Sequence, residues 1–248
     1  MLATSKAEHR LVLGKDITNG LGAGGDPSVG QAAAESSIDD LYEILQGANM
    51  VFIAAGMGGG TGTGAAPIVA QVAKDLGALT IAIVTRPFSF EGERRRKNAI
   101  EGINALKEVV DAIIIVSNDK LMMMNGTRPI GEAFAESDRV LAQSVKTITD
   151  LIVVPGVINL DFADVKATLQ DKGLALIGFG TGSGPKKAND AASSALLSPL
   201  LEASIHGAHS IIANVTCGNN VSLDEVKEAI DYITSAAGNT PNIIFGVQ

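Results

Sequence analysis

Short, nearly uninterrupted apolar runs mark the first half of the chain. The runs at 50–55, 79–84 and 112–116 are rich in Ile, Val and Ala. Strands buried on both faces have this pattern, because neither face of such a strand requires polar residues. We therefore predict three strands of a mostly parallel sheet.

Helical patterns fill the segments between these runs. Apolar positions recur at helical spacing over 27–46, from Ala65 to Leu76 and over 92–109, and a further short strand is expected at 10–13. Strands that alternate with helices indicate an α/β fold with a doubly wound, Rossmann-like parallel sheet. Ligands of such sheets bind outside the carboxyl ends of the strands.

One long helical pattern, at 130–152, divides the chain. It is longer than an ordinary globular helix, so we interpret it as a central helix. It separates an N-terminal domain, 1–129, from a second, smaller α/β domain, 153–248. In this second domain we expect helices at 162–170, 185–201 and 223–236 and strands at 174–179, 210–215 and 242–245.

The composition of the chain limits which binding partners and which cellular compartment are expected. The 248 residues are 46% hydrophobic and carry a formal net charge of −8, so neither nucleic acid nor an anionic membrane is expected as a partner. The single cysteine, Cys217, excludes an internal disulfide, and a cytoplasmic location is expected. We find no apolar run long enough to cross a bilayer, so we expect no direct membrane insertion.

The stretch after the first buried run is the strongest candidate for binding chemistry. Six of the nine residues from Gly56 to Gly64 are glycine. A strand, a glycine loop and a helix in this order present bare backbone N–H groups to a phosphate, and Thr61 and Thr63 can add hydroxyl donors. The alternative is a flexible turn, although such turns need only one or two glycines.

Two further observations bear on the ligand. A second glycine turn at 21–25 is followed by Asp26, which can cap a helix that starts at Pro27. The loop at 56–64 is not a Walker P-loop, because no Lys follows its last glycine. Gly60, Gly62 and Ala65 match a dinucleotide-binding fingerprint, which leaves an NAD(P)-dependent oxidoreductase open, but no acid ends the following strand.

Two pairs of side chains, each spaced four residues apart, could contact a nucleotide. Glu91 could accept from ribose hydroxyls while Arg95 neutralises phosphate, and a surface ion pair is the alternative. Phe134 can stack on a purine, and Asp138 would select guanine because a carboxylate only accepts hydrogen bonds. Asn118, at a strand end, could read the same base. The alternative for the second pair is a core Phe beside a solvated Asp.

An acidic motif lies beyond the long helix. Asn159 precedes Asp161 and Asp164, which are three residues apart at the start of a predicted helix. Asp161 can simply cap that helix. The two acids could instead polarise a water molecule for hydrolysis.

Five stretches resemble the signature loops of the tubulin/FtsZ family, and within it the bacterial cell-division branch. They occur in the family's order, and the resemblance covers essentially the whole chain. The stretches are GLGAGGDP at 20–27, GMGGGTGTGAAP at 56–67, PFSFEG at 87–92, NDKL at 118–121 and NLDFAD at 159–164.

This resemblance implies a GTP-binding enzyme that hydrolyses GTP to GDP, with Mg²⁺ bridging the phosphates. It implies that Glu91 contacts the ribose and Arg95 the phosphates, and that Asn118, Phe134 and Asp138 hold guanine. Asn159, Asp161 and Asp164 resemble the catalytic loop, which in the family reaches the nucleotide of the next subunit. The implied phosphate contacts are Gly22, Ala23, Gly24, Gly25, Gly58, Gly59, Gly60, Thr61, Gly62, Thr63 and Gly64.

The resemblance also implies self-association. Head-to-tail contacts generate open filaments, which in this family form the cytoplasmic mid-cell ring of cell division and septation. Family members begin with a further strand and glycine-rich loop, and end with further strands and a tail that recruits division-ring proteins. We therefore expect a fragment truncated at both ends, with impaired hydrolysis. A non-hydrolysing, filament-associated fragment is the alternative.

Overall fold

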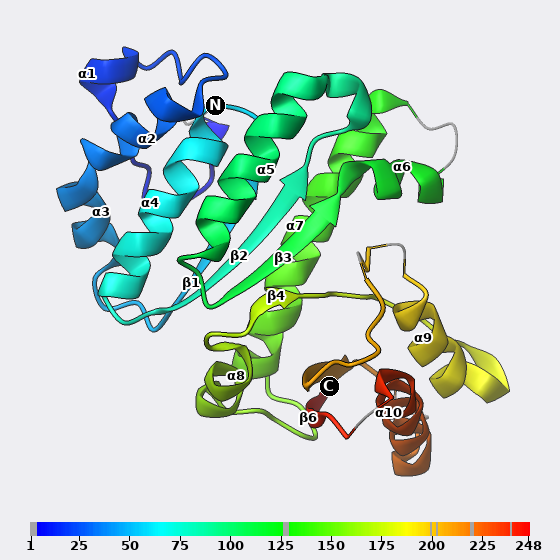
Figure 1. The fold of residues 1–248 in the computed structure, drawn as a ribbon. Helices are drawn as coiled ribbons and strands as arrows, with labels where there is room; N and C mark the ends of the chain where they lie inside the picture. The colour runs from blue at the N-terminus through cyan, green and yellow to red at the C-terminus, as the bar shows by residue number, and fades with distance from the viewer. Residues whose placement is uncertain (1–3, 126–128, 199, 202, 219–220, 239) are drawn as a thin grey trace. The chain divides into compact units, whose positions relative to one another are not determined.

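The computed structural model describes residues 4–125, 129–198, 200–201, 203–218, 221–238 and 240–248 (Figure 1). The chain divides into two compact units, Met1–Asp119 and Lys120–Gln248. Both units combine helices with parallel strands, so the predicted α/β class is confirmed.

A parallel sheet organises the first unit. Its strands β1 (Met50–Gly56), β2 (Leu79–Arg86) and β3 (Ala112–Ser117) are neighbours in that order, and all three confirm the predicted strands. The helices of this unit are α1 (Lys15–Thr18), α2 (Pro27–Glu35), α3 (Ile38–Leu45), α4 (Thr61–Asp75) and α5 (Glu93–Lys107), with a 3-10 turn at Ser89–Glu91.

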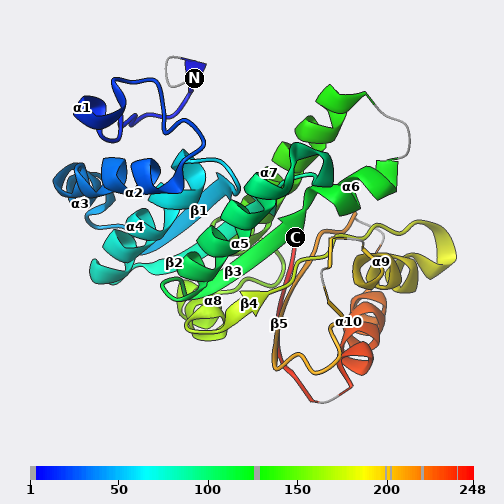
Figure 2. The same cartoon turned by 45° about the horizontal axis from the view of Figure 1, so that its top comes forward.

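Helices α4 and α5 lie side by side on one face of this sheet (Figures 1 and 2). Small residues on α4 allow its backbone to approach the strands closely, and larger side chains on β1 and β3 fill the space between the layers. The buried residues of this layer include Ala66, Ala70 and Ala73 on α4, Ile103 and Leu106 on α5, and Val51, Ile53, Ala82, Val84, Ile113 and Ile115 on the strands.

The N-terminal segment differs from the sequence-based expectation in two places. No strand forms at 10–13; the chain instead turns at Gly14, whose φ is 54° and whose N–H donates to Ser37 Oγ. The single helix predicted at 27–46 is two helices, because Ser36 and Ser37 interrupt it. Ser36 Oγ donates to the Ala33 carbonyl, a local bond that competes with helix continuation.

The second unit contains a long helix and a smaller α/β layer. It holds α7 (Ile130–Val153), and α6 (Asn118–Asn125) begins at the junction of the units. The other elements are α8 (Phe162–Leu169), β4 (Gly173–Ala175), a 3-10 turn at Gly184–Lys186, α9 (Lys187–Leu196), β5 (Ser210–Val215), α10 (Leu223–Ala237) and β6 (Asn242–Val247). Among the described residues, no helix combines the length and apolarity needed to cross a membrane.

Strands β5 and β6 are parallel neighbours, and α10 connects them. Ala213 and Val247 of the strands pack against Val226 and Ile230 of α10. The strand predicted at 174–179 is shorter, because regular pairing ends at Ala175. The helix predicted at 185–201 begins at Lys187, after the turn at Gly184–Lys186, and ends at Leu196.

A buried carboxylate joins α4 to the start of the sheet. Asp111 Oδ1 lies 2.7 Å from Lys74 Nζ, and Asp111 Oδ2 accepts the Thr80 N–H at 2.8 Å. The Asp111 side chain is only 2% exposed. A buried acceptor with two donors of this kind holds the helix end and two strand starts in register.

Replacing Asp111 with alanine is expected to lower the free energy of unfolding by about 2 kcal/mol, because two donors lose a buried acceptor. Urea denaturation followed by circular dichroism measures this loss. The matched control is Asp75→Ala, which removes an acid at the end of α4 whose hydrogen bonds from Tyr42 and Gln71 are exposed, and it should cost less than about 1 kcal/mol. Equal losses in the two variants would contradict a structural role for Asp111.

Candidate functional site

The glycine loop lies between β1 and the N-terminus of α4. Strand β1 ends at Gly56 and α4 begins at Thr61. The N-cap residue of α4 is Gly60, so no side chain caps the first N–H groups of this helix. The first N–H groups of a helix have no partner within the helix, so an uncapped start is available to an anion. The sequence pattern predicts a helix start at Ala65; in the structure the last residues of the glycine loop form the first turn of α4.

The second glycine turn leads into a helix whose N-terminus is already occupied. Asp26 Oδ1 accepts the Ser28 N–H at 2.9 Å and the Ser28 hydroxyl at 2.7 Å, as the predicted cap requires. These two bonds, with a smaller contribution from the charge of Arg94, hold the pKa of the Asp26 carboxyl below its ordinary value. Of the two helices that follow the glycine loops, α4 is therefore the one with an N-terminus free of a side-chain cap.

The glycines of the two loops serve different purposes. A Cβ on Gly60 would lie 2.6 Å from Ala23 Cβ, and one on Gly64 would lie 2.0 Å from the Pro27 carbonyl oxygen. These glycines let α4 and the segment around α2 approach closely. A Cβ on Gly59 would meet nothing within 4 Å, and the same holds for Gly22, Gly24 and Gly25. Only this second group faces open space that a ligand could enter.

The two threonines of the loop have different surroundings. Thr63 is buried, and its Oγ1 accepts the Gly58 N–H at 2.9 Å, which closes the loop onto the first turn of α4. Thr61 is exposed at the start of the helix. The hydroxyl of Thr63 therefore shapes the loop, whereas Thr61 faces solvent.

The predicted partners Glu91 and Arg95 are brought together. Arg95 Nη1 donates to Glu91 Oε2 at 2.5 Å, and Glu91 Oε1 accepts the Phe88 N–H at 2.9 Å. The carboxylate thus closes the 3-10 turn before α5 and also orients the guanidinium. This pair adjoins the glycine loop, because a Cβ on Gly58 would lie 2.8 Å from the Arg95 carbonyl oxygen.

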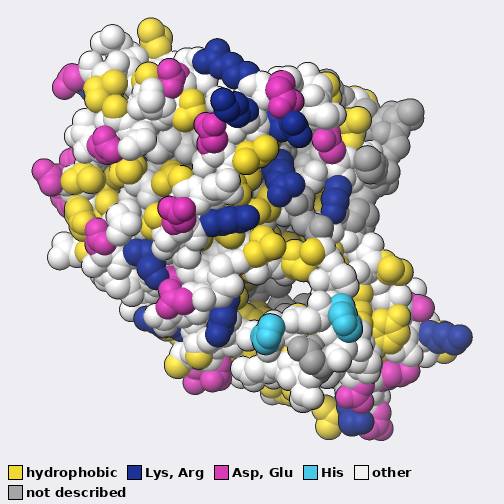
Figure 3. Space-filling view, in the orientation of Figure 1, with side chains coloured by type: hydrophobic (Ala, Val, Ile, Leu, Met, Phe, Trp, Pro, Cys, Tyr) yellow, Lys and Arg dark blue, Asp and Glu magenta, His cyan; other side chains and the backbone are white. Residues whose placement is uncertain are grey.

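Acids on the same helix neutralise much of the basic run that begins α5. Arg96 Nε and Nη2 donate to the two carboxylate oxygens of Glu93, at 3.0 and 2.9 Å. Lys97 Nζ lies 3.9 Å from Glu101 Oε1. The bond from Arg96 holds the pKa of Glu93 below its ordinary value. Figure 3 shows basic side chains interspersed with acidic ones over this face of the first unit. The run is therefore not a continuous basic patch.

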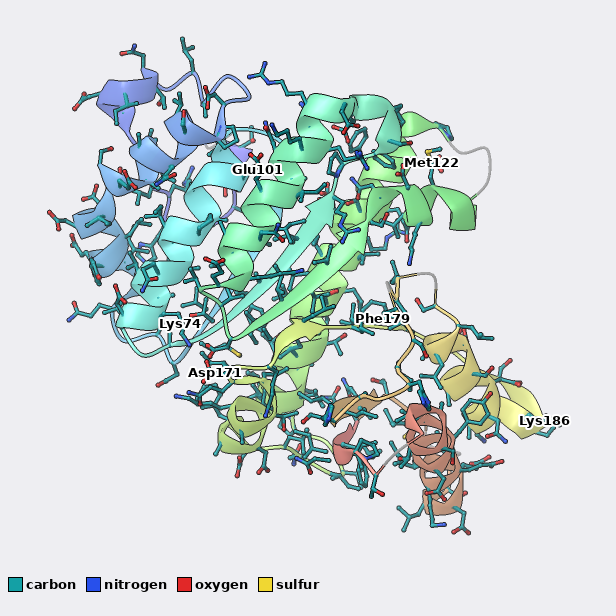
Figure 4. The ribbon with its side chains drawn as sticks, in the orientation of Figure 1. Lys74, Glu101, Met122, Asp171, Phe179 and Lys186 are labelled. Carbon is teal, nitrogen blue, oxygen red and sulfur yellow. The ribbon has the colours of Figure 1, made fainter. Side chains whose placement is uncertain are left out.

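A cleft of about 320 Å³ opens where α2, α4 and α5 meet. Glu101, labelled in Figure 4, stands on α5 at its wall. Thr63, Gly64 and Asn98 also line it, so the cleft adjoins the residues that hold the glycine loops in place.

Asn118 follows β3 directly and is 5% exposed. Its neighbour Asp119 accepts the Ser89 N–H at 2.9 Å, which joins the loop after β2 to the turn after β3. The glycine loop, Glu91 and Asn118 all follow the carboxyl ends of the three parallel strands, where ligands of such sheets bind.

In the second unit, Phe134 and Asp138 lie one turn apart near the start of α7, and both are exposed. The alternative interpretation of Phe134 as a core residue is therefore wrong, because Phe134 is 43% exposed. Along the same unit, Asn159 Oδ1 accepts the Gly156 N–H at 2.6 Å. Asp161 caps α8 by accepting the Asp164 N–H at 2.8 Å, as one of the two interpretations of this acid predicted.

The acids of this loop remain open to solvent beside exposed apolar side chains. Asn159, Asp161 and Asp164 are all exposed. Val153 and Val157, at the end of α7 and in the following loop, are 75% and 84% exposed. The polar loop is therefore flanked by exposed apolar side chains.

Sequence reasoning missed three residues that build the loops. Gly30 on α2 and Gly102 on α5 are contact glycines: a Cβ on either would lie within 2.4 Å of α4 or its N-cap. The Asn98 side chain donates to the carbonyls of both glycine loops. A glycine within a predicted helix is a weak signal of close packing, whereas nothing in the local pattern distinguishes Asn98.

Comparisons with known proteins agree over the whole chain. A sequence model of the tubulin/FtsZ family GTPase domain matches residues 1–126, and one of the FtsZ family C-terminal domain matches residues 173–248. An empty FtsZ dimer from M. jannaschii is 43% identical, with a TM-score of 0.94 over 100% of this chain and 72% of that one.

Two structures from Haloferax volcanii share the fold. CetZ1, a GDP-bound monomer, is 21% identical, with a TM-score of 0.79 over 96% of this chain and 73% of that one. CetZ2, a GTPγS-bound protofilament, is 24% identical, with a TM-score of 0.76 over 99% and 75%. The family models and the identity to the M. jannaschii protein show that this chain belongs to the tubulin/FtsZ family of GTPases, as a member of its FtsZ branch.

Proposed function

We propose that this protein binds GTP at the glycine loops of its first unit and hydrolyses it to GDP and phosphate. The observation that carries the proposal is the uncapped N-terminus of α4 beside Gly59, the glycine of this loop whose added Cβ would meet nothing within 4 Å. An open helix N-terminus with bare N–H groups suits a phosphate group. Membership of a GTPase family and the GDP-bound CetZ1 structure support a guanine nucleotide.

The remaining contacts follow from the chemistry of each side chain. The phosphates would lie against Gly22 to Gly25 and Gly58 to Gly64, with Arg95 supplying positive charge and Glu91 accepting from the ribose. Asn118, Phe134 and Asp138 would hold guanine. In the described part of the chain, no three potential acidic, His or Cys ligands converge on one point. Mg²⁺ is usually held by one or two carboxylates together with the phosphates of the substrate, so the nucleotide would supply part of its ligands.

Hydrolysis would be completed by a second copy of the chain. Asp161 and Asp164 are exposed carboxylates that can polarise a water molecule, and Asn159 stands beside them. The exposed valines around this loop and the protofilament of CetZ2 support head-to-tail self-association. The filament so formed would act in the cytoplasmic ring of cell division at mid-cell, with other ring proteins as partners.

Guanine selection gives the direct test of the nucleotide assignment. The unmodified chain is expected to bind GTP more tightly than ATP, because adenine offers no adjacent donor pair to the Asp138 carboxylate. Asp138→Ala should reduce this preference by about 10- to 100-fold, the size expected for hydrogen bonds to a charged group. Equilibrium competition between the two nucleotides measures the preference.

The matched control for this test is Asp150→Ala, which removes another carboxylate from the same helix, one that pairs with Lys146. The control should leave the preference unchanged. Equal binding of GTP and ATP by the unmodified chain would count against the guanine assignment.

A further inference from the structure

Asn98 bridges the two glycine loops from a third element. It lies in the second turn of α5 and is half-buried. Its Nδ2 donates to the Gly25 carbonyl oxygen at 3.3 Å and to the Gly58 carbonyl oxygen at 3.4 Å. A side-chain amide carries two N–H groups, so one nitrogen can serve both acceptors.

Both acceptors belong to glycine segments whose local backbone does not fix one conformation. Gly25 and Gly58 have φ values of 77° and 108°, in the region that glycine adopts without strain. Glycine backbones sample many conformations, so a glycine loop needs external contacts to keep one of them. Asn98 supplies such a contact to each loop from the body of a long helix.

The contact at Gly58 has a consequence for the next residue. In a planar trans peptide, the carbonyl of one residue and the N–H of the next point in opposite directions. When Asn98 holds the Gly58 carbonyl toward α5, the Gly59 N–H is turned away from α5. Gly59 is the loop residue whose added Cβ would meet nothing within 4 Å. The space beside the Gly59 α-carbon is therefore open, next to an N–H that points away from α5.

Packing alone does not fix this direction. A Cβ on Gly58 would lie 2.8 Å from the Arg95 carbonyl oxygen and 3.2 Å from Pro87 Cγ, so the Gly58 α-carbon is confined. Confinement of an α-carbon still leaves the peptide plane that follows it free to rotate, because φ and ψ are soft dihedrals. A hydrogen bond to the carbonyl removes that freedom.

We propose that Asn98 is a positioning residue that presets the Gly58–Gly59 peptide, and couples it to Gly25, for a phosphate group of the nucleotide. This inference rests on the proposed function. Asn98 itself does not touch the ligand; it acts through the Gly59 N–H. Its contribution is therefore confined to ligands that carry phosphate.

The test compares a phosphorylated ligand with its parent nucleoside. GDP and guanosine are titrated against the full chain by competition with a fluorescent GDP analogue, since GDP avoids turnover. Asn98→Ala is expected to weaken GDP binding by about 10-fold, the size of one to two lost hydrogen bonds, and to leave guanosine binding unchanged. The matched control is Asn104→Ala, an exposed asparagine on the same helix, which should change neither.

A second variant keeps the volume of the side chain. Asn98→Asp replaces the donor by an acceptor-only carboxylate, so it should weaken GDP binding more than Asn98→Ala while guanosine again binds as before. Circular dichroism on each variant verifies folding.

Three results would overturn the inference. The first is an equal loss of affinity for GDP and guanosine in Asn98→Ala, and the second is no loss of affinity for GDP. The third is unfolding of Asn98→Ala while Asn104→Ala stays folded. Each of these results points to a purely structural role for Asn98 or to no role. Failure of the proposed function looks different: the unmodified chain itself then binds neither GDP nor guanosine, and the inference falls with it.

Discussion

Gly64→Ala is expected to destabilise the first unit by about 2 kcal/mol. The added methyl carbon would lie 2.0 Å from the Pro27 carbonyl oxygen and 2.6 Å from the Gln31 nitrogen. Both are backbone atoms of α2, so no side-chain rotation relieves the clash, and overpacking of this kind costs about 3 kcal/mol, the upper end of the usual range. The better helix propensity of alanine returns only about 1 kcal/mol. Urea denaturation with circular dichroism gives the loss directly.

Gly59→Ala is the matched control within the same loop. Its methyl group would meet nothing within 4 Å, so the free energy of unfolding should stay within about 0.5 kcal/mol of the unmodified value. Affinity for GTP should nevertheless fall at least about 10-fold, because the methyl group occupies the space proposed for a phosphate. A loss of stability in Gly59→Ala together with unchanged stability in Gly64→Ala would contradict the division into packing glycines and ligand-facing glycines.

Asp161→Asn is expected to lower GTP turnover by about 1000-fold, within the range for loss of a group that positions and deprotonates water. Asparagine caps helices as well as aspartate does, so α8 should keep its N-cap. The substitution therefore isolates the charge of the carboxylate. Phosphate release at saturating GTP measures turnover, and GDP affinity should be unchanged. A parallel loss of GDP binding would contradict the assignment of Asp161 to catalysis.

Mixing two inactive variants tests whether the acid acts on a neighbouring subunit. At GTP concentrations well below its raised Kd, Gly59→Ala keeps the acidic loop but is mostly free of nucleotide, whereas Asp161→Asn binds GTP but lacks the acid. In random head-to-tail assembly, about one quarter of contacts pair a bound nucleotide with an intact acid, so about a quarter of the activity should return. No recovery in mixtures whose pelleted filaments contain both variants would contradict catalysis across the subunit contact.

Local pattern alone was sufficient for the sheet and for the helix caps. The runs at 50–55, 79–84 and 112–116 became β1, β2 and β3, because strands buried on both faces leave a continuous apolar signature. Asp26 and Asp161 cap helices as expected, since the capping bond spans only two or three residues. The glycine loop was recognisable for the same reason: strand, loop and helix are consecutive.

Tertiary structure decided what depends on distant residues. The helix break at Ser36 and Ser37 is also a contact site, because Ser37 Oγ accepts the Gly14 N–H, and no periodicity within 27–46 can reveal that contact. Gly64 is required by the close approach of α2 and Gly60 by that of the turn before α2, and Asn98 reaches two loops that are far from it in sequence. Patterns of polar and apolar residues report which face of an element is buried. They carry no information on which backbone carbonyl lies opposite, and in this site those contacts orient the loops.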